Sequence, residues 1–246
     1  MALKEELESS GNWLFRWRSY VPLVMVPVLL LAMQEYLLPV KNETLYHLWD
    51  AFCLLISSLG LVIRILTIGY TPKGTSGRNT KKQVAFTLNT TGMYSITRNP
   101  LYLGNFVIGL GFALFLYLWW LVVIYILVFW LYYERIIYAE EEFLRRKFGD
   151  EYLNWANETP VLIPDFGKFR KAALRFSWKN VLKREYNGFL AIIATMFALN
   201  TVGRLFACGT LDFDKPWLVL LCVGLAVWVI FRTLKVHTSL LNEEGR

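Results

Sequence analysis

The sequence has few charged residues and few of the side chains that bind metals. Only 18% of its 246 residues are Asp, Glu, Lys or Arg, whereas 56% are hydrophobic and 16% are aromatic. This composition excludes an ordinary soluble domain. The two histidines, His47 and His237, are too few for an imidazole metal site, and the three cysteines, Cys53, Cys208 and Cys222, have no paired spacing. We therefore expect neither a metal cofactor nor a disulfide framework.

The chain also lacks internal repeats and linkers. No repeat of fixed period is visible, and no Gly/Ser-rich or Pro-rich stretch divides the sequence. We therefore expect a single domain over residues 1–246. Transporters tend to show internal duplication and charged residues at mid-bilayer depth, and this chain shows little of either. A transporter or a non-catalytic lipid-binding protein is the alternative to an enzyme, and cofactor binding distinguishes them.

Long uncharged runs are present instead, and they predict an all-α polytopic membrane protein. A hydrocarbon core about 30 Å thick needs roughly 20 apolar helical residues to cross it. Suitable runs occupy residues 20–38, 48–70, 101–133, 187–207 and 216–234. The run 101–133 would form one helix about 50 Å long, so we expect a tight helical hairpin that turns near residues 117–120. The total is then about six spanning helices.

The placement of the charged residues predicts the orientation. The net charge of +7 would favour nucleic-acid binding in a soluble protein. Here the basic residues gather on one side of the predicted spans, and the loops on the other side hold only Lys41 and Lys215. This is the positive-inside pattern, so we expect both termini in the cytoplasm and no nucleic-acid partner. The first apolar run is too long for a cleavable signal sequence, and we expect it to stay as an anchor.

Two long polar stretches, residues 71–100 and 134–186, fall on this cytoplasmic side. The first begins with a basic segment, residues 73–82, that is rich in Gly and hydroxyl groups but lacks the spacing of a phosphate-binding loop. This segment could bind an anionic substrate headgroup through Arg78, Lys81 and Lys82, or it could be a flexible loop held against anionic lipids. An active site built from both stretches would lie at the cytoplasmic membrane surface.

The end of the first stretch has the pattern Gly92-x-Tyr94-x-x-x-Arg98-Asn99-Pro100-x-Tyr102-x-Gly104. Proline is common in the first turn of a helix, so Arg98 and Asn99 should lie just ahead of a helix N-terminus whose free N–H groups favour anions. A carboxylate could bind there. Taken singly, Tyr94 and Tyr102 could be interfacial aromatics and Arg98 could reach the headgroups. Their joint spacing favours a binding site.

The second stretch contains three consecutive carboxylates, residues 140–142, followed by apolar residues at helical intervals. We expect the second helix of the hairpin to leave the bilayer, to reach Phe148 and to end at Gly149. Adjacent helical residues point about 100° apart, so one carboxylate can face the protein while another faces water. The alternative is a solvated surface with contacts such as Glu142 to Arg146.

Together, the two segments resemble the isoprenylcysteine carboxyl methyltransferase and phospholipid methyltransferase superfamily of membrane enzymes. The second segment matches as Glu140-Glu141-x-x-Leu144-x-x-x-Phe148-Gly149-x-x-Tyr152. The resemblance implies an S-adenosylmethionine-dependent methyltransferase that releases S-adenosylhomocysteine, with its cofactor site at the cytoplasmic face. The family-like core then covers about residues 48–165, and residues 187–234 form an extra C-terminal helical pair.

The resemblance also implies which residues form the cofactor site: Tyr94, Arg98, Asn99, Pro100, Tyr102, Gly104, Glu140 and Glu141. Arg98 and the helix start would bind the cofactor carboxylate. Its ammonium or ribose would contact Glu140 or Glu141, and its adenine or sulfonium would contact one of the tyrosines.

Arg98, Asn99 and Glu141 are the residues to which the resemblance assigns catalysis. Asn99 stands where the family usually has His. An amide donates and accepts hydrogen bonds but does not titrate near neutrality, so this position cannot supply an imidazole base.

The expected acceptor is a membrane lipid or a lipidated substrate. Methyl transfer is an in-line displacement on an activated electrophile, so positioning and desolvation can carry it and an ionised oxygen is a suitable nucleophile. The basic segment 73–82 favours an anionic headgroup, a phosphate or a carboxylate. The family also implies prenylcysteine carboxyl methylation or phosphatidylethanolamine N-methylation as alternatives. Residues 75–80 and 88–94 are similar to bacterial members, which favours a phosphorylated lipid and a bacterial inner membrane over the endoplasmic reticulum.

Arg64 and Arg204 are the remaining conspicuous charges, because each lies near the end of a predicted span. An arginine within a membrane segment is a functional candidate by default. Both are close enough to an interface to extend their side chains toward it, so we expect headgroup contact for both rather than catalysis.

Overall fold

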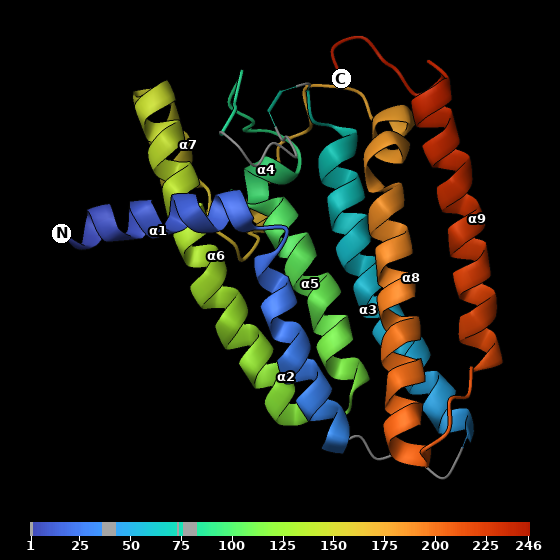
Figure 1. Ribbon diagram of the computed structural model, residues 1–246. Helices are drawn as coiled ribbons and strands as arrows, with labels where there is room; N and C mark the ends of the chain where they lie inside the picture. Colours follow the sequence, from blue (N-terminus) through green and yellow to red (C-terminus); the bar gives the residue numbers. More distant parts are fainter. Residues whose placement is uncertain (1, 36–42, 73, 76–82) are drawn as a thin grey trace.

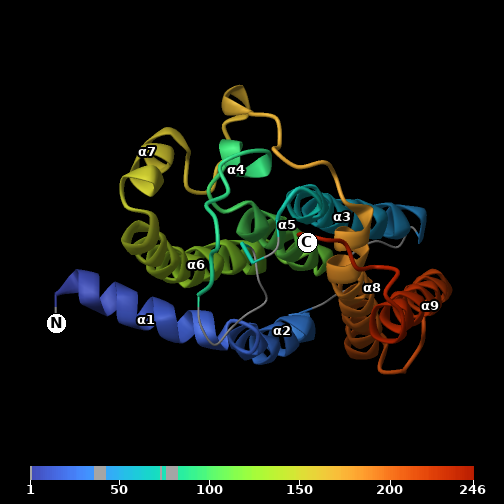
Figure 2. The same ribbon diagram turned by 90° about the horizontal axis from the view of Figure 1, so that it is seen from above.

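The computed structural model of the chain describes residues 2–35, 43–72, 74–75 and 83–246. Within these residues all regular secondary structure is helical, as predicted (Figure 1). The long helices are α3 (Glu43–Gly69), α5 (Pro100–Phe115), α6 (Trp119–Phe148), α8 (Trp178–Cys208) and α9 (Lys215–His237). They pack as neighbours in the order α6, α5, α3, α8 and α9 (Figures 1 and 2).

Four helices among the described residues are long and apolar enough to cross a membrane: Thr44–Gly69, Trp119–Phe148, Trp178–Cys208 and Lys215–His237. The other two predicted spans are shorter apolar helices, Met25–Glu35 and Pro100–Phe115. The 16 residues of α5 extend about 24 Å, less than the thickness of a hydrocarbon core. The chain is therefore a polytopic helical membrane protein, and the count of six spans stays a prediction.

The predicted hairpin is confirmed. α5 ends at Phe115 and α6 begins at Trp119, so the turn occupies residues 116–118, within the uncharged run 101–133. Tyr117 in this turn has a φ of +59°, a conformation that non-glycine residues rarely adopt. The ring of Trp49 stacks on Tyr117 at 5.3 Å, and the Trp49 indole N–H donates to the Leu114 carbonyl at 3.1 Å. Contact with α3 therefore supports the tight turn.

The second helix of the hairpin also ends as predicted. α6 continues to Phe148, and Gly149 follows with a φ of +53°. A residue with positive φ cannot continue the helix, so the chain changes direction into α7 (Asp150–Glu158). The carboxylates at residues 140–142 consequently lie in the last turns of α6, close to α7.

The N-terminal segment, for which the sequence predicted no helix, forms an amphipathic helix, α1 (Leu3–Trp17). It lies across α6 (Figure 1). The chain then continues through the 3₁₀ helix η1 (Val21–Val24), α2 (Met25–Ala32) and the 3₁₀ helix η2 (Met33–Glu35). The last residues of the predicted first span, 36–38, lie outside the described residues.

The two ends of the bundle differ in character. An apolar cluster surrounds the hairpin turn and buries Phe115, Leu116, Leu121, Met196 and Trp217. The short elements α4 (Met93–Ile96), α7 and η3 (Phe166–Lys168) gather at the opposite end, where the C-terminus also lies (Figure 1). The polar stretches of the sequence thus meet at one end of a helical scaffold.

Candidate functional site

A cavity of about 350 Å³ lies at this polar end, a size typical of small-molecule sites. Seven of the eight residues predicted to bind the cofactor line it: Tyr94, Arg98, Asn99, Pro100, Tyr102, Glu140 and Glu141. The loop ahead of α5 and the end of α6 therefore face the same space.

The loop ahead of α5 is held by the segment that follows α7. The Gly92 N–H donates to the Arg170 carbonyl at 2.9 Å, and the Arg170 N–H donates to the Ser95 hydroxyl at 2.9 Å. Further along, the Thr97 hydroxyl donates to the Leu162 carbonyl at 3.1 Å. Gly92 has a φ of +62°, which favours glycine at this bend. These bonds position the residues that follow.

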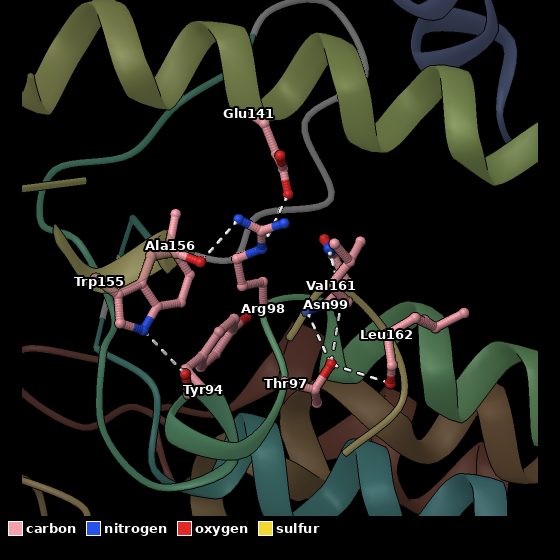
Figure 3. Close-up of polar contacts among 9 residues, drawn as sticks. All are labelled: Tyr94, Thr97, Arg98, Asn99, Glu141, Trp155, Ala156, Val161 and Leu162. Carbon is pink, nitrogen blue, oxygen red and sulfur yellow. Dashed lines mark hydrogen bonds and ion pairs between the residues drawn. The ribbon is translucent and has the colours of Figure 1, made fainter. Parts of the chain in front are cut away.

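Arg98 meets Glu141 across the cavity (Figure 3). Its Nε lies 3.2 Å from Glu141 Oε1, and its Nη1 donates to the Ala156 carbonyl at 3.2 Å. Arg98 Nε and Glu141 Oε1 form an ion pair without a well-directed hydrogen bond in the described part of the chain, and the buried Tyr152 hydroxyl interacts with the same Glu141 carboxylate. A cation, a carboxylate and a phenol thus meet at one place in the cavity wall.

Asn99 occupies the N-cap position of α5, and Pro100 is the first helical residue as predicted. The Asn99 side-chain amide donates to the Val161 carbonyl at 3.0 Å. The Asn99 carbonyl accepts the N–H groups of Tyr102 and Leu103. The start of α5 therefore offers few free N–H groups to an anion, and the anion-binding role predicted for this region falls mainly to Arg98.

The two predicted tyrosines lie on different sides of the loop. The Trp155 indole N–H donates to the Tyr94 carbonyl at 3.2 Å, which ties α4 to α7 (Figure 3). Burial, and secondarily the nearby Glu140 carboxylate, raises the pKa of Tyr94, so its phenol stays protonated at neutral pH. The ring of Tyr102 lies 4.6 Å from the ring of Tyr133 on α6. Aromatic faces therefore border the cavity from both segments.

Gly104 does not line the cavity. A Cβ at this position would lie 2.6 Å from Arg64 Cγ and 2.9 Å from the Gly60 carbonyl oxygen. The absence of a side chain thus allows α5 to approach α3 closely, and Gly104 affects the cavity through the position of Arg64.

Three residues predicted to bind the substrate, Arg78, Lys81 and Lys82, lie outside the described residues. Arg204 pairs with Asp212 at 2.7 Å near the C-terminal end of α8. It does not line the cavity.

The acidic run is divided between the cavity and α1. Glu140 and Glu141 line the cavity. Glu142 instead forms ion pairs with Lys4 at 3.3 Å and with Arg145 at 3.1 Å. In the alternative interpretation Glu142 would contact Arg146; here Arg146 forms its ion pair with Glu8 of α1, and Glu142 acts on it only through a weaker electrostatic interaction.

Arg64 does not point to the headgroups, so this interpretation of the sequence is wrong. Its Nε and Nη2 donate to the two carboxylate oxygens of Glu185, both at 2.8 Å, and its Nη1 donates to Asn105 Oδ1 at 2.7 Å. The three residues line the cavity and join α3, α5 and α8. The sequence indicated Arg64 as a functional candidate because it is a charged residue within an apolar run. Nothing in the sequence identified Glu185 as its partner.

Arg18, Phe15 and Arg184 also line the cavity, although the sequence interpretation assigned them no role. Arg18 Nη1 lies 3.8 Å from Glu140 Oε1, and its guanidinium lies 4.2 Å from the centre of the Phe15 ring. The signal that could have revealed Phe15 and Arg18 is their helical spacing with Gly11 on one face of the N-terminal segment.

Comparison with known proteins is consistent with this geometry. Residues 51–151 match the phospholipid methyltransferase family. The protein-S-isoprenylcysteine O-methyltransferase of Saccharomyces cerevisiae is 30% identical over 164 residues, which cover 65% of this chain and 69% of the yeast protein. The nickel-cobalt-cadmium resistance protein NccN of Alcaligenes xylosoxydans xylosoxydans is also 30% identical over 164 residues, covering 65% and 70%.

A shorter match is to the protein-S-isoprenylcysteine O-methyltransferase of Schizosaccharomyces pombe. It is 34% identical over 77 residues, which cover 31% of this chain and 33% of that protein. No solved structure gives a significant match. The family match at residues 51–151 contains all eight predicted cofactor residues, whereas Arg18, Arg184 and Glu185 lie outside it.

Proposed function

Because the chain belongs to the isoprenylcysteine carboxyl methyltransferase and phospholipid methyltransferase superfamily, we propose that it transfers a methyl group from S-adenosylmethionine to a membrane-borne lipid. The observation that carries this proposal is the 3.2 Å approach of Arg98 to Glu141. That approach joins the two segments that resemble the family at one cavity.

The residues around the cavity fit the chemical groups of the cofactor. Arg98 Nε and Glu141 Oε1 are buried 3.2 Å apart at the cavity, and the Tyr152 hydroxyl lies beside the Glu141 carboxylate. Arg98 suits the cofactor carboxylate, and Glu141 suits its ammonium or ribose hydroxyls. Tyr94 and Trp155 provide aromatic faces for the adenine.

The bound cofactor would supply a methyl group on a cationic sulfur, which is already an activated electrophile. The protein then has to orient the acceptor and exclude water, and both effects can be large. Apolar side chains from three helices, Phe15, Leu101 and Phe143, form part of the wall. Asn99 can orient a neighbouring group through its amide, but it does not abstract a proton near neutral pH.

The charge of the cavity favours an anionic acceptor. Four arginines and three glutamates line it: Arg18, Arg64, Arg98, Arg184, Glu140, Glu141 and Glu185. With all of these groups ionised, the lining has a net positive charge. A lipid phosphate or carboxylate would complement it better than an ammonium headgroup. Prenylcysteine carboxylates fall within this class, and phosphatidylethanolamine is the contrasting substrate.

The proposed location is a bacterial inner membrane with both termini in the cytoplasm. Support for this orientation comes from the basic residues around the polar end and their near absence from the opposite loops of the sequence. The cofactor would then enter from the cytoplasm, and the lipid would approach within the adjacent leaflet.

Calorimetric titration of the purified protein with S-adenosylhomocysteine tests cofactor use. Binding by the wild type and weaker binding by Glu141→Gln are expected. Glu151→Gln is the control, because Glu151 is exposed on α7 and does not line the cavity. A wild type that does not bind would favour a transporter or a non-catalytic lipid-binding protein.

The acceptor class is tested by incubating membranes that contain the protein with S-adenosylmethionine carrying a labelled methyl group. The lipids are then separated by class. Label in acidic lipids or lipidated carboxylates is expected. Label confined to methylated phosphatidylethanolamine species would contradict an anionic acceptor.

A further inference from the structure

Helix α1 has two apolar faces of different character. On the inner face Gly11 and Phe15 are buried against α6. On the outer face Trp13, Trp17 and Tyr20 are 57%, 44% and 62% exposed. The three outer rings form a continuous stripe, with centroids 6.5 Å and 5.9 Å apart. The inner face is explained by packing, whereas the outer stripe requires another environment.

The membrane interface is the environment that fits this stripe. Tryptophan and tyrosine are enriched at the headgroup level, and amphipathic helices lie there with their apolar faces toward the acyl chains. The chain continues from α1 through η1 into the apolar helix α2, and α1 and α2 lie on the same side of α5 and α6 (Figure 2). We assign the outer face of α1 to the lipid headgroup layer.

The inner face of α1 is fixed to the end of α6. A Cβ at Gly11 would collide with the Arg135 carbonyl oxygen, so the helices are in close contact. Ion pairs join Lys4 to Glu142 at 3.3 Å and Glu8 to Arg146. This attachment holds Arg18, just after the end of α1, at the cavity wall.

The two cavity glutamates of α6 are approached by arginines from different directions. Arg98 reaches Glu141 from the loop held by α7, and its Nη1 also donates to Ala156. Arg18 approaches Glu140 from the side of α1, with its Nη1 3.8 Å from Glu140 Oε1. The cavity therefore has one arginine, Arg98, on the side of α7. It has another, Arg18, on the side of α1.

We propose that Arg18 binds the anionic headgroup of the lipid acceptor on the α1 side of the cavity. This inference rests on the proposed methyltransferase function and adds the residue that recognises the acceptor. A lipid headgroup approaches from the headgroup layer, which is where α1 lies, and a guanidinium binds phosphate or carboxylate oxygens in a two-pronged geometry. The Phe15 ring beneath the guanidinium restricts its orientation.

The test compares Arg18→Gln with Arg16→Gln. Arg16 lies on the same helix, is exposed and does not line the cavity. Binding of dioleoyl phosphatidic acid to the full-length protein in detergent micelles is measured by native mass spectrometry with saturating S-adenosylhomocysteine. Phosphatidylethanolamine is the zwitterionic control lipid. Arg18→Gln should weaken phosphatidic acid binding about tenfold to a hundredfold, because charge-assisted hydrogen bonds are lost.

The control variants separate a specific contact with Arg18 from a general effect of surface charge. Arg16→Gln should bind phosphatidic acid like the wild type, and Arg18→Lys should retain part of the affinity because it keeps the charge. Both Gln variants should keep the wild-type affinity for S-adenosylhomocysteine. Inorganic phosphate should compete poorly, because it lacks the acyl chains that bring a lipid to α1.

Equal losses of phosphatidic acid binding in the two Gln variants would overturn the inference, since they would indicate general attraction to the surface. So would a loss of S-adenosylhomocysteine affinity alone in Arg18→Gln, or strong competition by inorganic phosphate. A wild type that does not bind S-adenosylhomocysteine contradicts the proposed function itself. Normal S-adenosylhomocysteine binding with unchanged phosphatidic acid binding in Arg18→Gln contradicts only the role of Arg18.

Discussion

At the scale of single residues, Arg98 is held by contacts from its backbone and from its side chain. Its backbone N–H donates to the Pro160 carbonyl at 2.9 Å, and its guanidinium is held between Ala156 and Glu141. A side chain that is already oriented loses little conformational entropy when a ligand binds. Arg98 is therefore the residue whose replacement should affect cofactor affinity most clearly.

Replacement of Arg98 by Lys should weaken S-adenosylhomocysteine binding about tenfold or more, because an ammonium keeps the charge but lacks the planar fork. Arg170→Lys is the matched control, since Arg170 pairs with Glu158 on the exposed surface. The measurement is calorimetric titration of both variants. An Arg98→Lys variant with wild-type affinity would exclude Arg98 from the cofactor site.

Asn99 stands where the family usually has His. Its replacement tests how much the site depends on this difference. Its amide donates to the Val161 carbonyl at 3.0 Å, and an imidazole N–H can donate to the same acceptor. Asn99→His should therefore keep cofactor affinity, whereas Asn99→Ala should lower the free energy of unfolding by about 1 kcal/mol. Thermal unfolding together with titration checks both outcomes. Equal unfolding stability and equal cofactor affinity of Asn99→His and Asn99→Ala would show that this hydrogen bond contributes to neither.

At the scale of elements, patterns that depend on local sequence were predictable and those that depend on a distant partner were not. The uncharged run 101–133 predicted the hairpin, and Gly149 predicted the end of α6. α1 was missed because its buried residues form a narrow stripe among charged ones, and its helix is stabilised by contacts with α6. The lengths of α2 and α5 also differ from the apolar runs, because an apolar run can include turns as well as helix.

The contact between α3 and α5 depends on Gly104. Because a Cβ there would lie 2.9 Å from a backbone oxygen of Gly60, Gly104→Ala should force the helices apart and destabilise the protein by about 1–3 kcal/mol. Gly224→Ala on α9 is the control, since its Cβ would meet the flexible end of Ile193 at 3.2 Å. Thermal unfolding in detergent should show a larger decrease for Gly104→Ala. Similar decreases would contradict this packing.

The ion pair of Arg64 with Glu185 connects α3 to α8. Glu185 is only 4% exposed, so Glu185→Leu would leave the Arg64 charge buried without its carboxylate and should destabilise the protein by about 3–5 kcal/mol. The double variant Arg64→Met with Glu185→Leu should recover much of that loss, because no buried charge is left at this pair. Unfolding measurements on both variants and the wild type form the test. A double variant less stable than Glu185→Leu would contradict the coupling.

At the scale of the whole molecule, the cavity combines the family region with segments outside it. Residues 51–151 provide the predicted cofactor residues, and these were predictable because their spacing is carried by short local motifs. The residue that follows α1, Arg18, lines the cavity, and α8 adds Arg184 and Glu185. These residues were not predictable, because only the packing of distant helices brings them to the cavity. The orientation in the membrane and the acceptor stay predictions.

A structure of the protein determined with bound S-adenosylhomocysteine tests the central claim most directly. The expected result is adenosyl density in the cavity between residues 92–104 and the end of α6, with its amino-acid portion against Arg98 and Glu141. Density bound elsewhere, or an empty cavity at saturating ligand, would contradict the claim that this cavity holds the cofactor.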